Sequence, residues 1–399
     1  MRRSARRVLE TVFDAAVYFV CVLALVLWPL RQIRRAVDGG RIRSIWSGTP
    51  IINMATNARA ERLLGVDARS IVQSTYFITD AFDVDLSRIT RLPLLGRLVP
   101  LVLMLWAAVF ADRLHFYCDR GFLPSRTSYT FDFRELWVFH TLGIPVLLWT
   151  YGADVRSRGA CLRLGEPNCC SECDAPGRYC ICDDGRQAAN IQRLKAFSSA
   201  IFSGVGDMFG FVPDSVDDLY YWPVDFDAGG GERYRPYYPD SDPHRPLRIV
   251  HATNHRIFKG SRHLIAAVEK LRAQDVPIEL LLVERKPNAE ALELYRSADV
   301  IFDNCLMGSI GYFAFEGMAL GKPVMCFVRD PEAYLLRARE CPVIRTHVNS
   351  LEADLRRLVA NRAELSVLGR SARRYVETYF SMAAFAARLA DAYRRLGIA

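Results

Sequence analysis

The segment between Asp299 and Arg329 constrains the fold more than any other part of the chain. Its two ends, Asp299–Phe302 and Val324–Val328, are short apolar runs that are typical of buried strands. Between them lies a helical pattern, Tyr312–Leu320, which a glycine and a proline then stop. A strand, a glycine turn, a helix and a second strand favour a parallel sheet, which binds ligands beyond the carboxyl ends of its strands. The sequence therefore predicts an α/β fold with a ligand site at the glycine turn.

Two glycines and one glutamate give this segment its chemistry. Gly308 and Gly311 allow a close backbone approach, and the start of the following helix offers free N–H groups to a phosphate. Glu316 lies one turn into the helix between apolar neighbours, where an unpaired carboxylate is costly. Because a carboxylate accepts two hydroxyl hydrogen bonds, a ribose or sugar diol would suit it. Plain turn glycines and a core glutamate paired with a lysine are the alternatives.

The unit resembles the nucleotide-sugar site of GT-B glycosyltransferases, particularly glycosyltransferase family 4. Members of that family carry two glutamates separated by seven residues, and then a helix of small residues and Gly-x-Pro-Val. Glu316 matches the second glutamate, and the segment Gly317–Val324 matches the helix and the Gly-x-Pro-Val after it. The first glutamate would fall at position 308, which is Gly308 in this chain. Since the family's first glutamate commonly contacts the donor sugar, the resemblance is closer on the ribose side than on the sugar side.

Length and pattern predict two domains. A chain of 399 residues, 51% of them hydrophobic, can form two separate cores. Strand and helix patterns alternate along residues 44–225 and again along 247–399, which predicts two Rossmann-like, doubly wound domains facing a crevice. Residues 226–246 are rich in Gly, Pro, Asp and Tyr and are interpreted as the linker. The last helices resemble the terminal helices of GT-B enzymes, one of which usually crosses back onto the first domain.

The first 43 residues form a basic arm with an apolar centre. Nine arginines precede Ser44 against three carboxylates. The apolar run Ala15–Trp28 lies between two arginine clusters and is shorter than the roughly 20 residues of a spanning helix. Basic flanks on both sides favour a helix anchored at an anionic membrane surface. A marginal single span and a helix packed on the first domain are the alternatives. A second apolar run, Leu92–Phe110, contains two prolines and an arginine and is interpreted as a buried helix.

Cysteine is concentrated in one predicted insertion, residues 161–182, which holds six of the 11 cysteines. Two close pairs, Cys170 with Cys173 and Cys180 with Cys182, have the spacing of a structural zinc site. Reduced free thiols and two disulfides are the competing interpretations, although the scattered remaining cysteines favour a reducing compartment. The insertion contains no histidine, so we expect no catalytic zinc and no cofactor for catalysis.

Loops after predicted strands supply the other candidate residues. Arg256 and Lys259 follow the first strand of the second domain and would bind a diphosphate. In similar family 4 enzymes an Arg and a Lys do this without a metal. Asp154 follows a strand and a glycine in the first domain and would face the crevice from the opposite wall. There it would stabilise an oxocarbenium-like state, take the acceptor's proton or bind the acceptor. Solvated loop cations and a salt bridge between Asp154 and Arg156 are the alternatives.

The remaining patterns narrow the function. No serine-hydrolase elbow, Walker loop, dinucleotide fingerprint or nucleic-acid motif is present, which disfavours hydrolase, kinase, dehydrogenase and nucleic-acid-binding functions. His115, His251 and His255 are weaker candidates, and His251 is the best placed of them. We expect a membrane-associated hexosyltransferase at the cytoplasmic face, acting in polysaccharide biosynthesis. It would transfer a sugar from a nucleotide sugar to a lipid-linked or surface-polysaccharide acceptor, with the retention that the family 4 resemblance implies. A nucleotide-sugar 2-epimerase and a non-catalytic nucleotide-sugar-binding subunit are the alternatives.

Overall fold

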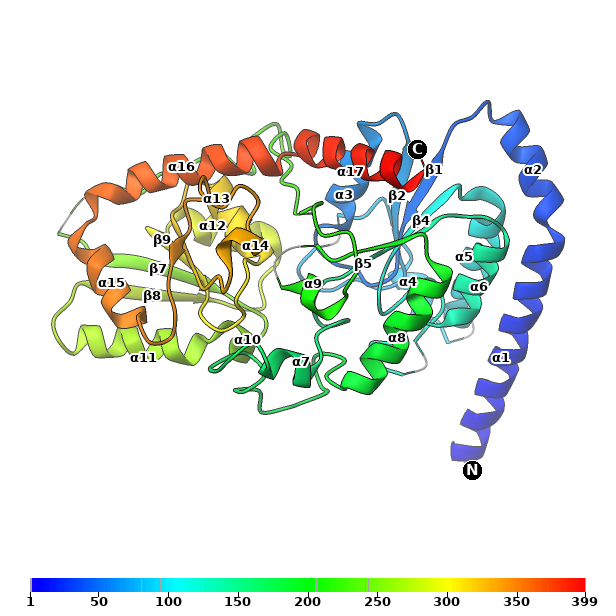
Figure 1. Ribbon diagram of the computed structural model, residues 1–399, viewed down its shortest axis with the longest axis horizontal. Coiled ribbons are helices and arrows are strands. Elements are labelled where there is room, and N and C mark those ends of the chain that lie inside the picture. Colours follow the sequence, from blue (N-terminus) through cyan, green and yellow to red (C-terminus); the bar gives the residue numbers. More distant parts are fainter. Residues whose placement is uncertain are drawn as a thin grey trace.

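The computed structural model describes residues 2–79, 81–93, 95–125, 127–204, 207–220, 222–240, 242 and 244–398, with side chains from residue 8 onward. It contains two α/β lobes, each built around one parallel sheet, and the lobes lie side by side in Figure 1. The predicted fold class, two Rossmann-like domains with a hydrophobic N-terminal helix, is confirmed.

The first sheet has the strand order β3-β2-β1-β4-β5-β6, and its pairings are parallel. The strands are β1 (Arg43–Trp46), β2 (Asp67–Val72), β3 (Val84–Asp85), β4 (Arg113–Tyr117), β5 (Val146–Trp149) and β6 (Ala200–Phe202). Strands β4 and β5 are buried along their whole length, as expected of a parallel sheet covered on both faces. Strand β1 pairs with β2 on one side and β4 on the other, so the order reverses between β1 and β4 and the loops after these strands face a crevice.

The second sheet has the strand order β11-β10-β9-β7-β8, again with parallel pairings. The strands are β7 (Leu247–Ala252), β8 (Ile278–Val283), β9 (Val300–Asn304), β10 (Val324–Cys326) and β11 (Ile344–Arg345). Here the order reverses between β7 and β9, which is where open α/β sheets bind ligands. The predicted unit of strand, glycine turn, helix and strand is present as β9, α13 (Tyr312–Ala319) and β10. Gly321 follows the helix at φ +76°, a left-handed conformation that suits glycine.

Helices cover both sheets. In the first lobe they are α3 (Met54–Arg62), α4 (Ser87–Thr90), α5 (Leu95–Phe110), α6 (Phe133–Thr141), α7 (Arg158–Leu162), α8 (Asp184–Phe197) and α9 (Met208–Phe211). The second lobe adds α10 (Arg256–Lys259), α11 (Ser261–Arg272), α12 (Asn288–Arg296), α14 (Pro331–Tyr334) and α15 (Leu351–Ala360) to α13.

The last two helices, α16 (Ala363–Phe380) and α17 (Met382–Leu396), run along both lobes (Figure 1). Helix α16 packs on α13 of the second lobe, whereas α17 packs on α3 of the first. Ser381 separates them, and its hydroxyl accepts a hydrogen bond from the Ala384 N–H as the N-cap of α17. Near the end of α17, the Tyr393 hydroxyl donates to the buried Glu61 carboxylate. The crossing back onto the first domain that the resemblance implied is therefore present.

The N-terminal arm packs against the first lobe as α1 (Arg2–Val26) and α2 (Trp28–Val37), on α5 and α6. Arg31 and Arg34 do not face outward as a lipid-binding cluster would. The guanidinium of Arg31 donates to the Ala111 carbonyl, and Arg34 forms a bidentate ion pair with Asp112. Two arginines of the basic cluster after the apolar run therefore make contacts inside the protein, because Asp112 and a buried carbonyl need partners.

The opposite face of α1 is apolar and exposed. The stretch Val8–Val26 has a mean hydropathy of 2.0 and only 22% of its most apolar window is buried, so it is long and apolar enough to cross a membrane. Phe19 and Val22 are 67% and 60% exposed. Helix α5 adds exposed Leu98 and Val102, so the prediction that this run is a buried helix holds for one face only.

Candidate functional site

A cavity of about 380 Å³ lies between the lobes, at the point where the second sheet reverses its order. The second lobe contributes the loops after β7, β8 and β9, one face of α12 and the first half of α13. The first lobe contributes the loop after β5 and two residues of the cysteine-rich insertion. The side chains that can ionise or donate hydrogen bonds along its wall include Tyr151, Arg156, Tyr179, Asn254, His255, Lys259, Arg285, Lys286, Asn288, Tyr312 and Glu316.

Glu316 is buried in the wall of this cavity, as the sequence predicted for a ligand-binding carboxylate. Asn288 Nδ2 and the Tyr234 hydroxyl donate to its Oε1 at 2.8 and 3.2 Å, which leaves Oε2 for a ligand. Burial raises the pKa of Glu316 to about 7, against the lowering effect of Asn288. No lysine among the described residues pairs with it, so the alternative of a lysine-paired core glutamate is not met. Tyr234 comes from the predicted linker, where no sequence signal marked it.

Lys259 lines the cavity beside the start of α13. Its ammonium donates to Asp303 Oδ1 at 2.5 Å, and Asp303 Oδ2 accepts the Gly311 N–H at 2.8 Å. A Cβ at position 311 would lie 2.6 Å from Lys259 Nζ, so a larger residue there would displace the ammonium. Asp303 was missed although it directly follows the predicted strand Asp299–Phe302. A carboxylate at the carboxyl end of a buried strand was the available signal.

Gly308, at φ +83°, explains the departure from the family pattern. A Cβ built at this position would lie 2.5–2.9 Å from the guanidinium atoms of Arg329. Arg329 therefore stands where the side chain of the family's first glutamate would begin. Its Nη1 is buried and has no hydrogen-bond partner among the described residues. The carboxylate expected here is absent and a cation fills the space.

Arg256 does not line the cavity. Its guanidinium is half exposed and forms a bidentate ion pair with Glu284 at 2.6 and 2.7 Å. The prediction that it faces the crevice is wrong, because the short helix α10 turns this side chain toward the loop after β8. Two other cations, Arg285 and Lys286, line the cavity from that loop. A basic pair directly after a strand was the signal that sequence reasoning passed over.

Asp154 lies behind the cavity wall and does not line it. Its Oδ1 accepts the N–H groups of Tyr151 and Gly152 at 3.0 and 2.9 Å, so the carboxylate closes its own turn. The expected orientation into the crevice is therefore wrong. The alternative salt bridge is also absent, since Arg156 instead forms a bidentate ion pair with Asp207.

The neighbour of Asp154 is a second buried carboxyl, Asp119. Thr49 and the Tyr151 hydroxyl donate to Asp119 at 2.9 Å. Burial, and next the charge of Asp119, raises the pKa of Asp154 to about 8, and burial also raises the pKa of Asp119. These groups follow β1, β4 and β5, and Tyr151 is the member that reaches the cavity.

The three histidines differ in placement. His251 is fully buried, with its two ring nitrogens hydrogen-bonded to the Phe302 carbonyl and the Ser261 hydroxyl, and burial lowers its pKa to about 4. His115 is buried and stacks on Trp46 at 3.9 Å. His255 alone of the three lines the cavity, although His251 was expected to be the best placed.

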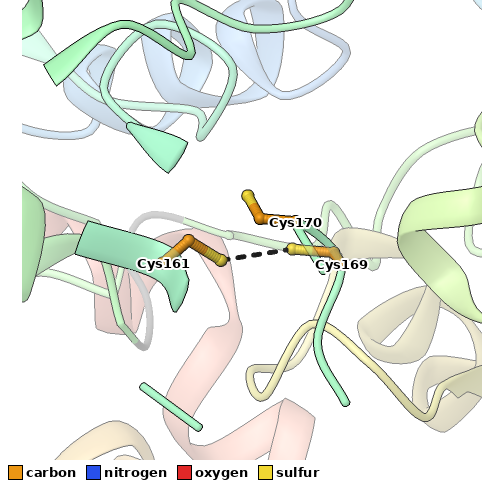
Figure 2. A group of neighbouring side chains, drawn as sticks. All are labelled: Cys161, Cys169 and Cys170. Atoms are coloured by element: carbon orange, nitrogen blue, oxygen red, sulfur yellow. Dashed lines mark hydrogen bonds between the residues drawn. The ribbon is translucent and has the colours of Figure 1, made fainter. Parts of the chain in front are cut away.

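The cysteine-rich insertion gathers a different set of thiols from the predicted one. Cys161, Cys169 and Cys170 have Sγ atoms within 4.8 Å of one another (Figure 2). Cys173, Cys180 and Cys182 do not join Cys170 in a metal-binding group among the described residues. The predicted four-thiol set is therefore corrected, since spacing along the chain could not tell which thiols the turns bring together. The cysteines are free in the structure, so the disulfide alternative is not met there.

No protein-family model matches this chain, and no curated protein sequence matches it significantly. Solved structures do resemble it. HepE of Anabaena in complex with UDP and glucose has a TM-score of 0.55 at 10% identity, over 89% of this chain and 100% of that one. A glycosyltransferase from Rickettsia africae has a TM-score of 0.52 at 11% identity, over 89% and 98%. Sucrose-phosphate synthase from Thermosynechococcus elongatus has a TM-score of 0.50 at 13% identity, over 89% and 99%. The chain therefore has the two-domain GT-B fold of glycosyltransferases.

Proposed function

We propose that this chain is a glycosyltransferase that takes its sugar from a nucleotide-sugar donor. The observation that carries the proposal is Glu316, a buried carboxylate with one oxygen held by two donors and the other left for a ligand in the wall of the cavity. Its free oxygen would accept hydrogen bonds from the ribose hydroxyls. Lys259 and the start of α13 would stabilise the diphosphate as the bond to the sugar breaks. The acceptor oxygen then bonds to the same sugar carbon and gives its proton to the departing diphosphate, with retention as the family 4 resemblance implies.

Arg329 does not line the cavity itself, and we propose that the donor sugar extends beyond the lining to meet Arg329, beside Gly308, instead of a glutamate. Lys259 is paired with Asp303 and Arg256 with Glu284, whereas Nη1 of Arg329 is buried without a partner among the described residues. A guanidinium binds carboxylates well because its N–H groups match the two oxygens. The charge reversal at the Gly308 position supports a donor sugar that carries a carboxylate, as a uronic acid does.

This assignment of Arg329 is tested by comparing UDP, UDP-glucose and UDP-glucuronic acid by titration calorimetry. A charge-assisted hydrogen bond contributes about 1.5–3 kcal/mol, so the acid should bind roughly 10- to 150-fold more tightly than UDP-glucose. Arg329→Gln should remove that preference and leave UDP affinity unchanged. An equal loss for all three ligands would assign Arg329 to the diphosphate and refute the sugar contact.

The acceptor would be lipid-linked and would approach along the N-terminal helix at the cytoplasmic face of the membrane. The exposed apolar face of α1 and α5 supports membrane association. A second cavity, of about 740 Å³, lies between α1 and the first lobe, lined by Leu9 and Phe13 together with Arg97, Arg120 and Arg134. The Nε of Arg120 in this cavity is buried without a partner in the part of the chain that the structure describes. Glu10 and Asp14 also line this cavity, and Arg134 is paired with Asp14 and Asp132, so a lipid phosphate would rely on Arg97 and Arg120.

The function is tested on the full-length chain purified in detergent. A thermal-shift screen against UDP, GDP and dTDP sugars identifies the donor, and release of the nucleoside diphosphate is then measured with and without a lipid-linked acceptor. A transferase releases the nucleotide only when the acceptor is present. Inversion of the sugar at carbon 2 without acceptor would show an epimerase instead. Donor binding with no turnover under any condition would show a binding subunit.

Membrane association has its own test. Phe19→Glu combined with Val22→Glu places two charges on the exposed face of α1 and should move the protein out of the membrane fraction. Val367→Glu, an equally exposed apolar position on α16, is the matched control and should change nothing. Deleting the arm is a poor test, because it would uncover α5 and leave Asp112 without Arg31 and Arg34. Membrane retention of the Phe19 and Val22 variant would contradict the proposed surface.

A further inference from the structure

Three cysteines of the insertion converge on one point. Cys161 lies in α7, and Cys169 and Cys170 lie in the loop that follows it. Each is at most 2% exposed. Cys161 Sγ and Cys169 Sγ are 3.7 Å apart, and Figure 2 shows Cys170 beside them. The cluster lies outside the cavity already described, since none of the three lines it.

Asn168 holds this arrangement in place. Its side-chain oxygen accepts the N–H groups of Cys170 and Ser171 at 2.8 and 3.0 Å. Its Nδ2 donates to the carbonyls of Cys161 and Gly165. Asn168 thus connects α7 to the turn that carries the adjacent cysteines Cys169 and Cys170. Because both lone pairs of its oxygen are used, Asn168 positions the thiols and is not itself a ligand.

The sulfur spacing fits a metal better than it fits a disulfide. A disulfide requires about 2.05 Å between sulfurs. Zinc–thiolate bonds of about 2.3 Å place the sulfurs of a tetrahedral site about 3.8 Å apart. The distance of 3.7 Å between Cys161 Sγ and Cys169 Sγ matches the second value, but a thiol–thiol hydrogen bond has the same length, so it is the convergence of the third sulfur, Cys170 Sγ, that points to a metal. We propose that Cys161, Cys169 and Cys170 bind one zinc ion, whose fourth position is taken by a donor other than these three thiolates.

The proposed centre would fix a bridge between the two lobes. Two residues after Cys170, the Glu172 carboxylate pairs with Arg262 and His263 of α11 at 2.9 and 2.8 Å. Farther along the insertion, the Tyr179 ring lies 5.2 Å from the His255 ring and lines the cavity between the lobes, which the proposed function assigns to the nucleotide. An ion bound at the base of the insertion would therefore hold one wall of the cavity against the second lobe. Without it, we expect the bridge to loosen and nucleotide affinity to fall.

The experiment measures zinc in the full-length protein, purified in detergent without added metal. We expect about one ion per chain, as for a thiolate-rich site. Cys161→Ser and Cys169→Ser should each reduce this to near zero. Cys173→Ser and Cys182→Ser, in the same insertion, are the matched controls and should keep the ion. Zinc loss in the Cys173 and Cys182 variants with retention in the Cys161 and Cys169 variants would overturn the assignment, as would wild-type protein without zinc.

A second measurement covers variants that fail to fold. Wild-type protein is alkylated with and without a zinc chelator, and the modified cysteines are identified by peptide mass spectrometry. Cys161, Cys169 and Cys170 should become reactive only with chelator, whereas the half-buried Cys173 and Cys182 should react in both samples. Protection that does not depend on chelator, or a disulfide between Cys161 and Cys169, would refute the metal centre.

Discussion

The two lobes meet the cavity with opposite chemistry. The second lobe presents cations at the point where its strand order reverses, with Lys259, Arg285 and Lys286 in the wall. The first lobe has two carboxyls, Asp119 and Asp154, at the ends of β4 and β5, but it buries both behind Tyr151. The second lobe is open to an anionic ligand, whereas the first lobe encloses its two acids, and its cation in the wall, Arg156, is already paired with Asp207. The comparison shows that a polar side chain in a loop after a strand reaches a ligand site only when the loop's own backbone N–H groups do not need it as a partner.

The largest effect is expected from breaking the Lys259–Asp303 pair. Lys259→Met leaves a buried carboxylate without its cation, which should cost about 3–5 kcal/mol of stability. Lys259→Met with Asp303→Asn should restore most of the stability but not the affinity for a nucleoside diphosphate, whereas nucleoside affinity should be unchanged. Thermal unfolding and titration with UDP and uridine measure both. Arg256→Ala is the control, an exposed pair worth less than about 1 kcal/mol. Normal UDP affinity in the double variant would show that Lys259 does not bind the phosphates.

Glu316→Ala should weaken nucleotide binding by roughly 10- to 150-fold and abolish transfer, because the ribose loses a charged partner worth about 1.5–3 kcal/mol. Titration with the nucleotide measures the loss, and circular dichroism checks the fold. Glu290→Ala is the matched control, since Glu290 is exposed on α12 and pairs only with Lys286 at 3.1 Å among the described residues. If folded Glu316→Ala protein binds the nucleotide with wild-type affinity, the proposed donor site is wrong.

The pH dependence of binding should follow Glu316. Its pKa of about 7 in the folded protein lies above the usual value of about 4.3, so the carboxyl is mostly neutral at pH 6. Binding that needs the carboxylate must release this proton, so uridine affinity should rise by up to about tenfold per pH unit below 7 and level off above it. The stability that the raised pKa provides at low pH is lost as pH rises through about 7. Glu316→Gln should flatten both profiles, and an unchanged slope in that variant would assign the titration elsewhere.

The smallest effect is expected at Asp154. Asp154→Asn keeps an oxygen for the N–H groups of Tyr151 and Gly152, so nucleotide binding and transfer should stay near wild type. Because the pKa of Asp154 is raised in the folded protein, the wild type should lose stability as pH rises from about 4 toward 8, whereas the variant cannot ionise and should gain on the wild type across that range. Transfer lost with nucleotide binding intact would show that Asp154 reaches the acceptor after all. The contrast between the two walls would then be wrong.

Sequence alone determined what depends on local signals. The apolar runs, the helix between them and the left-handed stop at Gly321 belong to β9, α13 and β10 because strand periodicity and glycine conformation act within a few residues. The same reasoning identified Glu316 as a carboxylate that needs a partner. It also identified the apolar helix at the N-terminus, since mean hydropathy needs no knowledge of neighbours.

Only the tertiary structure decided which distant groups meet. The pairing of Lys259 with Asp303, the contact of Tyr234 with Glu316 and the position of Arg329 beside Gly308 join residues 21 to 82 positions apart. The sequence carries no local mark of such contacts, because backbone turns set the direction of each side chain. The same holds for Asp154, which followed a strand as expected but turned back onto its own backbone N–H groups. Burial makes those N–H groups costly to leave unpaired, and that local demand decided where the carboxylate points.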